Sequence, residues 1–262
     1  MQLKKQRIKS KELKVNNKDN WYNDWFNSPY YHVLYRNRDN REAAEFLEKL
    51  IGALHITPDK KIIDIACGKG RHAIYLNKRG MDVTGVDLSP KNIDHAREYE
   101  NERLHFHVHD MRKVFKKEAF DIALNMFTSF GYFSSEAENK RVIQAANDNL
   151  SKEGQFVLDF LNPFRVINNL VPTEQIDIGN IRFTITRKVV DDLIVKEIEI
   201  DDQGKKMQFY ERVKAIRRVT FETFFSETGF KLENVFGDYR LGEYINTSSE
   251  RMIFHLIKTT KR

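Results

Sequence analysis

The sequence has one cysteine, Cys67, and therefore forms no internal disulfide bond. A lone cysteine suits the reducing cytoplasm, where disulfides are rare. The sequence also lacks an apolar run long enough to span a membrane. Its N-terminus is basic, but no apolar segment follows the positive charges, as a secretory signal would require. Together these absences predict a cytoplasmic protein with no membrane partner.

Positive charge is scarce outside the N-terminus. The formal net charge is +6, yet residues 1–20 hold seven basic and two acidic side chains. The other 242 residues therefore carry a net charge of only about +1. A nucleic-acid-binding domain usually presents a basic patch on the fold itself, so the composition argues against a nucleic-acid partner. The basic leader, residues 1–20, could still contact RNA or lipid.

The rest of the composition describes a globular protein. At 262 residues, the chain fits one large α/β domain, or one domain with an insertion. Hydrophobic residues make up 40% and charged residues 31%, as in soluble globular proteins. Aromatic residues reach 12%, which is enough to line a pocket. The sequence shows no internal repeat.

Strand and helix patterns alternate through the first part of the chain. Buried apolar runs predict strands at residues 60–65, 81–86, 104–109, 120–125 and 154–161. Helical patterns occur at residues 72–79, 89–100 and 136–150. Repeated βα units imply a parallel sheet with right-handed crossovers.

The pattern changes after residue 165. Strands at 181–190, 193–200 and 207–216 follow one another with turn signals and no helices between them, which predicts an inserted antiparallel β-meander. A helix that ends at Gly229 and strands at 231–236 and 251–258 close the chain. The predicted organisation is a basic leader, 1–20; an aromatic lid and helix, 21–56; a core, 57–165 and 217–262; and an insertion, 166–216.

The most informative motif follows the first predicted strand. Gly68-x-Gly70-x-x-Ala73 opens a helix, whose free amides favour a ligand at its N-terminus. Asp87 ends the second strand, where a carboxylate can accept the hydroxyls of a ribose. These features alone also fit a dinucleotide-binding dehydrogenase. Asp64 argues against a dinucleotide, because a carboxylate there would repel a pyrophosphate. It can instead engage the ammonium group of a cofactor that has no phosphate.

Two later features extend the motif. Asp110 follows the third strand, where it can contact an adenine amino group while Met111 packs on the ring. The chain also ends in a helix and two strands instead of another βα unit. In order, the motif residues are Asp64-x-x-x-Gly68-x-Gly70, Asp87, Asp110-Met111, Phe120-Asp121 and Gly229-Phe230.

This ordered set resembles the class I S-adenosylmethionine-dependent methyltransferases. The resemblance implies a Rossmann-like sheet of seven strands in the order 3-2-1-4-5-7-6, with strand 7 antiparallel. It also implies that the cofactor, S-adenosyl-L-methionine, lies across the carboxyl ends of strands 1 and 4. The expected cofactor-binding residues are Asp64, Ala66, Gly68, Gly70, Asp87, Leu88, Asp110, Met111, Asn125, Met126, Tyr31 and Arg38.

The methyl acceptor is expected beside residues 125–133. In relatives that methylate the amines of nucleic-acid bases, this place usually carries Asn/Asp-Pro-Pro-aromatic, but here Asn125 is followed by neither proline. An aromatic segment before the first strand, Tyr30 to Arg38, resembles the lid of small-molecule methyltransferases. The expected substrate-binding residues are Tyr35, Phe127, Phe130, Tyr132, Tyr210 and Arg212, although some of these aromatics could instead be core residues.

Methyl transfer is an in-line displacement, and alignment of the reacting atoms supplies much of its acceleration. A base is needed only if the nucleophile must lose a proton, and the candidates are Tyr31, His32 and Asp159. His105, His107 and His109 alternate along one strand, but a partly exposed polar face accounts for them better than a metal site. Cys67 is expected to be a packed residue and not a nucleophile, because its position beside the cofactor needs a small side chain.

The sequence therefore predicts a methyltransferase that acts on a small molecule by direct displacement. Two alternatives remain open: an RNA or protein methyltransferase that uses the basic leader, and a non-catalytic cofactor-binding module. The insertion could also form a homodimer contact. The sequence identifies neither the acceptor nor the methylated atom.

Overall fold

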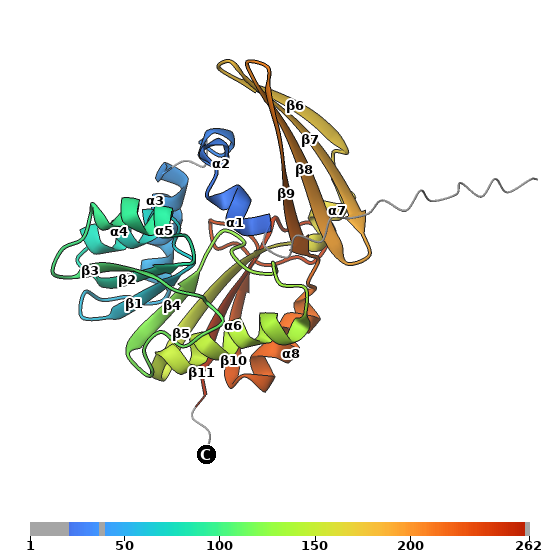
Figure 1. The fold of residues 1–262 in the computed structure, drawn as a ribbon. Coiled ribbons are helices and arrows are strands. Elements are labelled where there is room, and N and C mark those ends of the chain that lie inside the picture. The colour runs from blue at the N-terminus through green and yellow to red at the C-terminus, as the bar shows by residue number, and fades with distance from the viewer. Residues whose placement is uncertain (1–20, 37–39, 260–262) are drawn as a thin grey trace, which may run out of the picture.

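The computed structural model describes residues 21–36 and 40–259. Its centre is a seven-stranded sheet with the order β10-β11-β5-β4-β1-β2-β3 (Figure 1). The strands are β1 (Lys61–Ile65), β2 (Asp82–Asp87), β3 (Leu104–Val108), β4 (Phe120–Asn125), β5 (Leu150–Leu161), β10 (Phe230–Phe236) and β11 (Arg251–Lys258). Strands β1 to β5 pair in parallel, whereas β11 is antiparallel to both β5 and β10. The predicted strand order and fold class are confirmed.

The central strands are buried because helices cover both faces of the sheet. Four of the five residues of β1 are buried, as expected for a parallel strand enclosed on both sides. One face packs against α3 (Asn40–Ala53), α4 (Arg71–Lys78) and α5 (Pro90–Arg97). The other face packs against α6 (Glu136–Asn149) and α8 (Arg218–Glu227).

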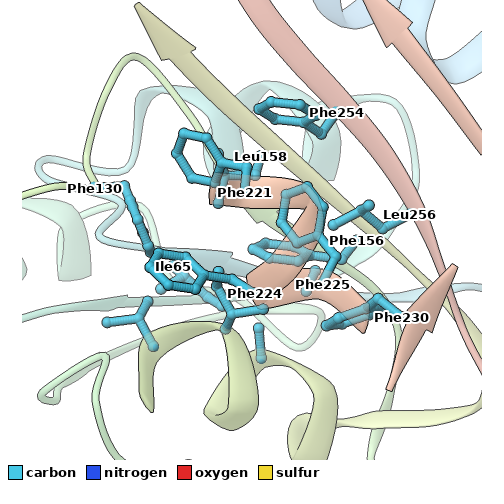
Figure 2. Packing of buried hydrophobic residues seen from close by; sticks show 14 of the residues in the cluster. Ile65, Phe130, Phe156, Leu158, Phe221, Phe224, Phe225, Phe230, Phe254 and Leu256 are labelled. Atoms are coloured by element: carbon cyan, nitrogen blue, oxygen red, sulfur yellow. The ribbon is translucent and has the colours of Figure 1, made fainter. Parts of the chain in front are cut away.

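The second face holds a core rich in phenylalanine. Figure 2 shows Phe130, Phe156, Phe221, Phe225 and Phe254 within this cluster. The ring of Phe221 lies 5.1 Å from that of Phe160 and 5.0 Å from that of Phe254. Burial of large aromatic surfaces and edge-to-face ring contacts both stabilise such a core.

The insertion is a separate antiparallel sheet with the order β6-β7-β8-β9. It follows the short helix α7 (Pro163–Asn168), and its strands are β6 (Thr173–Ile178), β7 (Ile181–Val190), β8 (Leu193–Asp202) and β9 (Lys205–Lys214). The last three correspond to the predicted meander. The sequence analysis missed β6, a mostly polar edge strand whose residues alternate between exposed and partly buried.

Two short helices connect the two sheets. They are α1 (Trp21–Phe26) and α2 (Pro29–Leu34), and α1 packs against β9 (Figure 1). Trp25 is fully buried among Phe183, Ile185 and Ile198 of the insertion. The aromatic lid predicted from the sequence therefore rests on the insertion. No helix in the part of the chain that the structure describes is long and apolar enough to cross a membrane.

Phe221→Ala should lower the free energy of unfolding by about 3–5 kcal/mol, because it leaves a cavity in the aromatic core. Val219→Ala is a matched control on the same helix, since Val219 is 66% exposed and should change stability by less than about 0.5 kcal/mol. Chemical denaturation measures both variants. Equal stability of the two variants would contradict this view of the core.

Candidate functional site

A cleft of about 1070 Å³ opens where the carboxyl ends of β1, β2 and β4 meet the lid and the insertion. The predicted site residues that line it are Tyr31, His32, Tyr35, Ala66, Gly68, Asp87, Leu88, Asp110, Met111, Met126, Phe127 and Tyr132. The structure thus gathers residues more than one hundred positions apart in the sequence around one space. The predicted site residues that do not line it are Asp64, Gly70, Asn125, Phe130, Asp159, Tyr210 and Arg212. Arg38 lies outside the described residues.

The glycine turn after β1 exposes backbone to the cleft at one glycine only. Gly68 has a φ of 58° and would place a Cβ in open space, so this position leaves room for a ligand. Gly70 has a φ of 80°, and a Cβ there would meet the Phe106 ring at 2.6 Å. Gly70 is therefore required by packing against β3 and by its left-handed backbone. The sequence alone suggests a different reason, the approach of a ligand to the backbone.

Asp87 is fixed by the backbone at the end of β2. Its Oδ2 accepts a hydrogen bond from the Gly68 amide at 2.9 Å, and its Oδ1 accepts one from the Ser89 amide at 2.8 Å. Burial raises the pKa of Asp87 above its ordinary value. Each carboxylate oxygen can accept more than one hydrogen bond, so Asp87 can also receive ribose hydroxyls from the cleft.

Asp64 lies behind the turn with an unsatisfied oxygen. It is 1% exposed, and its Oδ2 is buried without a hydrogen-bond partner. Burial, followed by the negative charge of Asp87, raises the pKa of Asp64 to about 7. A buried acceptor of this kind favours a donor, preferably a cation. The amino group of S-adenosylmethionine, reached directly or through water, meets that requirement, so these residues fit the expected cofactor.

Asp110 follows β3 on the cleft wall beside Met111. Arg112 holds the Asp110 carboxylate at 2.7 Å and also contacts Glu138 at 2.7 Å. Burial would raise the pKa of Asp110, but the hydrogen bonds and charge of Arg112 lower it. Asp110 is therefore an ionised acceptor with a fixed orientation, as recognition of an adenine amino group would need.

The segment after β4 divides between cleft and core. The Phe127 ring stacks between the rings of His72 and Tyr239. Its centroid lies 5.0 Å from each, with interplanar angles of 18° to His72 and 29° to Tyr239. Tyr132 contacts Trp21 of the lid at 5.4 Å. Phe130 is fully buried in the phenylalanine core and does not reach the cleft (Figure 2). Asn125 is also fully buried and donates from Nδ2 to the Ile65 carbonyl at 3.1 Å.

The lid also contacts the residues that follow β2. The hydroxyl of Ser89, the residue that caps α5, donates to Asn27 of the lid. Burial, with smaller contributions from Lys69 and His95, lowers the pKa of His32. His32 is therefore mainly a neutral imidazole at neutral pH, able to accept a proton.

A charged cluster ties the lid to the insertion. Glu211 of β9 accepts hydrogen bonds from the Trp25 indole at 2.7 Å and from the Tyr35 hydroxyl at 2.5 Å. Lys196 of β8 lies 2.6 Å from Glu211 and donates to Tyr35 at 2.5 Å. Burial would raise the pKa of Glu211, but the charge of Lys196 and the three donors lower it. We call these four residues the lid clasp.

Glu211 and Lys196 are not among the site residues predicted from the sequence. Those residues include Tyr210 and Arg212, which lie on the opposite face of β9, because neighbouring residues of a strand alternate between faces. Tyr210 instead bonds Glu197 at 3.3 Å on the outer face of the insertion. The available signal was the pairing of an acidic and a basic residue across two strands, Lys196 opposite Glu211.

Of the three histidines considered for a metal, His105 and His107 lie on β3 and His109 follows it. The rings of His107 and His109 lie 5.0 and 5.3 Å from the Phe115 ring. Within residues 21–36 and 40–259, no group of three or more histidine, cysteine, aspartate or glutamate side chains is arranged to hold a metal ion.

Glu211→Gln should loosen the lid, because Lys196 loses its buried counter-ion and Trp25 loses a charged acceptor. The chain has two tryptophans, and both lie in α1, so intrinsic fluorescence reports on the lid. We expect a red-shifted emission and stronger acrylamide quenching. Glu199→Gln, on the exposed face of β8, is the control and should leave the spectrum unchanged. Identical spectra for the two variants would show that the clasp does not hold the lid.

Asp64 should make the ligand-free protein less stable as pH rises. Its folded pKa of about 7 lies above the ordinary value of 3.8, so the folded state binds more protons between these values and loses stability as pH increases. Asp87 adds to the same trend, since its pKa is also raised. Asp64→Asn should therefore flatten the decline in Tm across this range. If Tm falls with pH as steeply in Asp64→Asn as in the wild type, Asp64 is not the group responsible for the decline.

Residues 62–154 match the family model described as a methyltransferase domain. Over 130 residues, the chain is 28% identical to the dTDP-3-amino-3,4,6-trideoxy-alpha-D-glucopyranose N,N-dimethyltransferase of Streptomyces venezuelae. That match covers 49% of this chain and 54% of the relative, so the chain spans about half the length of the relative.

Solved structures show the same fold. An S-adenosylmethionine-dependent methyltransferase from Clostridium acetobutylicum ATCC 824 superposes with a TM-score of 0.76 at 16% identity, covering 88% of this chain and 96% of that one. CalS10, an amino pentose methyltransferase from Micromonospora echinaspora solved with S-adenosylmethionine bound, gives a TM-score of 0.68 at 21% identity, covering 88% and 98%. Residues 62–154 therefore match a methyltransferase domain, and most of the chain shares the fold of solved S-adenosylmethionine-dependent methyltransferases.

Proposed function

We propose that the protein transfers a methyl group from S-adenosylmethionine to an amino group of a small molecule, by direct in-line displacement. The observation that carries the proposal is one shared cleft, which the glycine turn, the aromatic segment after β4 and the lid all line. When bound, the cofactor supplies a methyl group activated by a sulfonium.

The cofactor end of the cleft is assigned to residues of the core. Asp87 would bind the ribose, Asp110 and Met111 the adenine, and Asp64 the amino group. Gly68 leaves space for the ligand to approach the backbone. The remaining predicted contacts on the lining, Ala66, Leu88, Met126 and Tyr31, belong to the same proposal.

The acceptor end is assigned to the lid, the segment after β4 and the insertion. Trp21, Phe26 and Tyr132 form an aromatic wall with ring separations of 5.4 to 5.7 Å. Aromatic faces attract cations, so such a wall suits a sulfonium donor and a methylated ammonium product. Two relatives support an amine acceptor, since one is named as an amino-sugar N,N-dimethyltransferase and the other as an amino pentose methyltransferase.

A protonated amine must lose a proton before it attacks. Of the three predicted bases, His32 and Tyr31 line the cleft, and we assign His32 because its lowered pKa keeps it neutral at neutral pH. Asp159 is fully buried and already accepts hydrogen bonds from several donors. The acidic side chains Asp110 and Glu211 are each paired with a cation, so neither is assigned as the base.

A small-molecule acceptor is proposed because the cleft, about 1070 Å³ in volume, is near the size of small-molecule and cofactor sites. The alternative in which residues 1–20 hold RNA or protein predicts that deletion of these residues abolishes activity at physiological salt. Our proposal predicts that the truncated protein keeps its activity. A homodimer through the insertion and a cytoplasmic location remain further parts of this proposal, and sedimentation velocity tests the first.

Titration calorimetry with S-adenosylmethionine and with NAD should show binding of the first alone. Asp87→Ala should weaken cofactor binding about tenfold or more, because buried ribose hydrogen bonds are lost. Asp82→Ala is the matched control, since Asp82 lies at the opposite end of β2. Binding of NAD without S-adenosylmethionine would overturn the proposal.

The transfer itself is tested with methyl-labelled S-adenosylmethionine and a panel of amines, alcohols, phenols and carboxylic acids, including nucleotide-linked amino sugars. We expect label in an amine. Cofactor binding without label in any acceptor would support the non-catalytic alternative.

A further inference from the structure

The backbone after β4 is strained at two consecutive residues. Phe127 and Thr128 have φ values of 57° and 61°, in the left-handed region that favours glycine. Threonine is branched at Cβ and is particularly unfavourable there. Such a conformation is unfavourable, so it persists only where its surroundings enforce it. Phe127, Thr128 and Ser129 all line the cleft.

Asp159, at the end of β5, holds this strained turn through the backbone. Its Oδ2 accepts a hydrogen bond from the Phe127 amide at 2.8 Å. Its main-chain carbonyl accepts one from the Thr128 amide at 3.0 Å. The Tyr239 hydroxyl donates to the same Oδ2 at 3.1 Å, and the Tyr239 ring stacks on Phe127. One fully buried residue thus fixes two successive amides.

Arg251, at the start of β11, completes the arrangement. Its Nε donates to Asp159 Oδ1 at 2.7 Å, and its Nη2 donates to Thr128 Oγ1 at 2.8 Å. The guanidinium therefore joins the residue that holds the turn to the turn itself. Asn162 holds the loop before β11, because its Nδ2 donates to the carbonyls of Asn246 at 2.9 Å and Ser249 at 2.8 Å.

We infer that Asp159 and Arg251 are positioning residues for methyl transfer, which hold Phe127 and Thr128 in the strained turn that forms the acceptor side of the cleft. This inference rests on the proposed function. Asp159 is therefore assigned a different role from the general base considered from the sequence. The role differs from general support of the fold, because the hydrogen bonds act on two cleft-lining residues, Phe127 and Thr128, and not on the glycine turn after β1.

Thr128→Val tests the contact with least disturbance of the fold. The change keeps the shape of the side chain but removes the oxygen that Arg251 reaches. We expect kcat to fall about tenfold or more, because misplacement of reacting groups by a fraction of an ångström is costly. The Kd for S-adenosylhomocysteine should stay within about twofold. Thr128→Ser restores the oxygen and should restore kcat.

Asp159→Asn tests the carboxylate. The amide keeps one oxygen for the Phe127 amide but loses the charge that pairs with Arg251. We expect the same selective loss of kcat, assayed with the panel acceptor that the wild type methylates fastest. Asp121→Asn is the matched control. The Asp121 carboxylate also accepts a hydrogen bond from a backbone amide, that of Lys61 at 2.9 Å, but it lies at the opposite end of the strands.

Hydrogen exchange of residues 125–133 gives a second readout that needs no acceptor. The amide of Phe127 should be protected in the wild type and lose protection in Asp159→Ala, which removes the side-chain acceptor of that amide. Wild-type kcat in Thr128→Val and in Asp159→Asn would overturn the inference, as would unchanged protection of the Phe127 amide in Asp159→Ala. A wild type that methylates no panel acceptor would instead contradict the proposed function, and exchange would still decide whether Asp159 holds the turn.

Discussion

The parallel pairing of β2, β1 and β4 brings their carboxyl ends to one edge of the sheet, and the rest of the site depends on that constraint. Each strand delivers a different group to this edge: the glycine turn from β1, Asp87 from β2 and the strained turn from β4. The amide of Gly68 binds Asp87, so the first two strand ends are also joined by a hydrogen bond. The cleft is therefore a product of strand register and not of any single motif.

The second layer of the site comes from outside the sheet. The lid and the insertion are far apart in the sequence, but the lid clasp joins them through the buried carboxylate of Glu211. The lid also contacts the start of α5, where the Ser89 hydroxyl donates to Asn27. The segment that holds α1 and α2 therefore contacts both the end of β2 and the insertion.

The sheet could be predicted from the sequence because its signals are local and repeated. Buried apolar strands alternate with capped helices, and the motif residues fall at the ends of those strands. The interpretation of single residues was less secure. Gly70 fits a ligand-binding pattern, yet its close neighbour is the ring of Phe106, which lies on another strand. Phe130 belongs to the core, and a run of alternating aromatics does not reveal which ring faces inward.

Two further features depend on contacts that no local pattern encodes. Tyr210 and Glu211 are adjacent, and only the side on which the lid packs decides which of them reaches the cleft. The link from Asp159 to Phe127, Thr128 and Arg251 joins three separate segments, so it becomes visible only in the folded chain. The polar edge strand β6 escaped prediction because its partner strand, and not its own composition, makes it a strand.

We propose that one cleft binds S-adenosylmethionine at the strand ends and presents it to an acceptor beneath the lid. A crystal structure with S-adenosylhomocysteine would locate the ligand. We expect ribose hydroxyls on the Asp87 carboxylate, the adenine beside Asp110 and Met111, and the amino group directed toward Asp64. A ligand bound elsewhere, or one whose ribose makes no contact with Asp87, would contradict it.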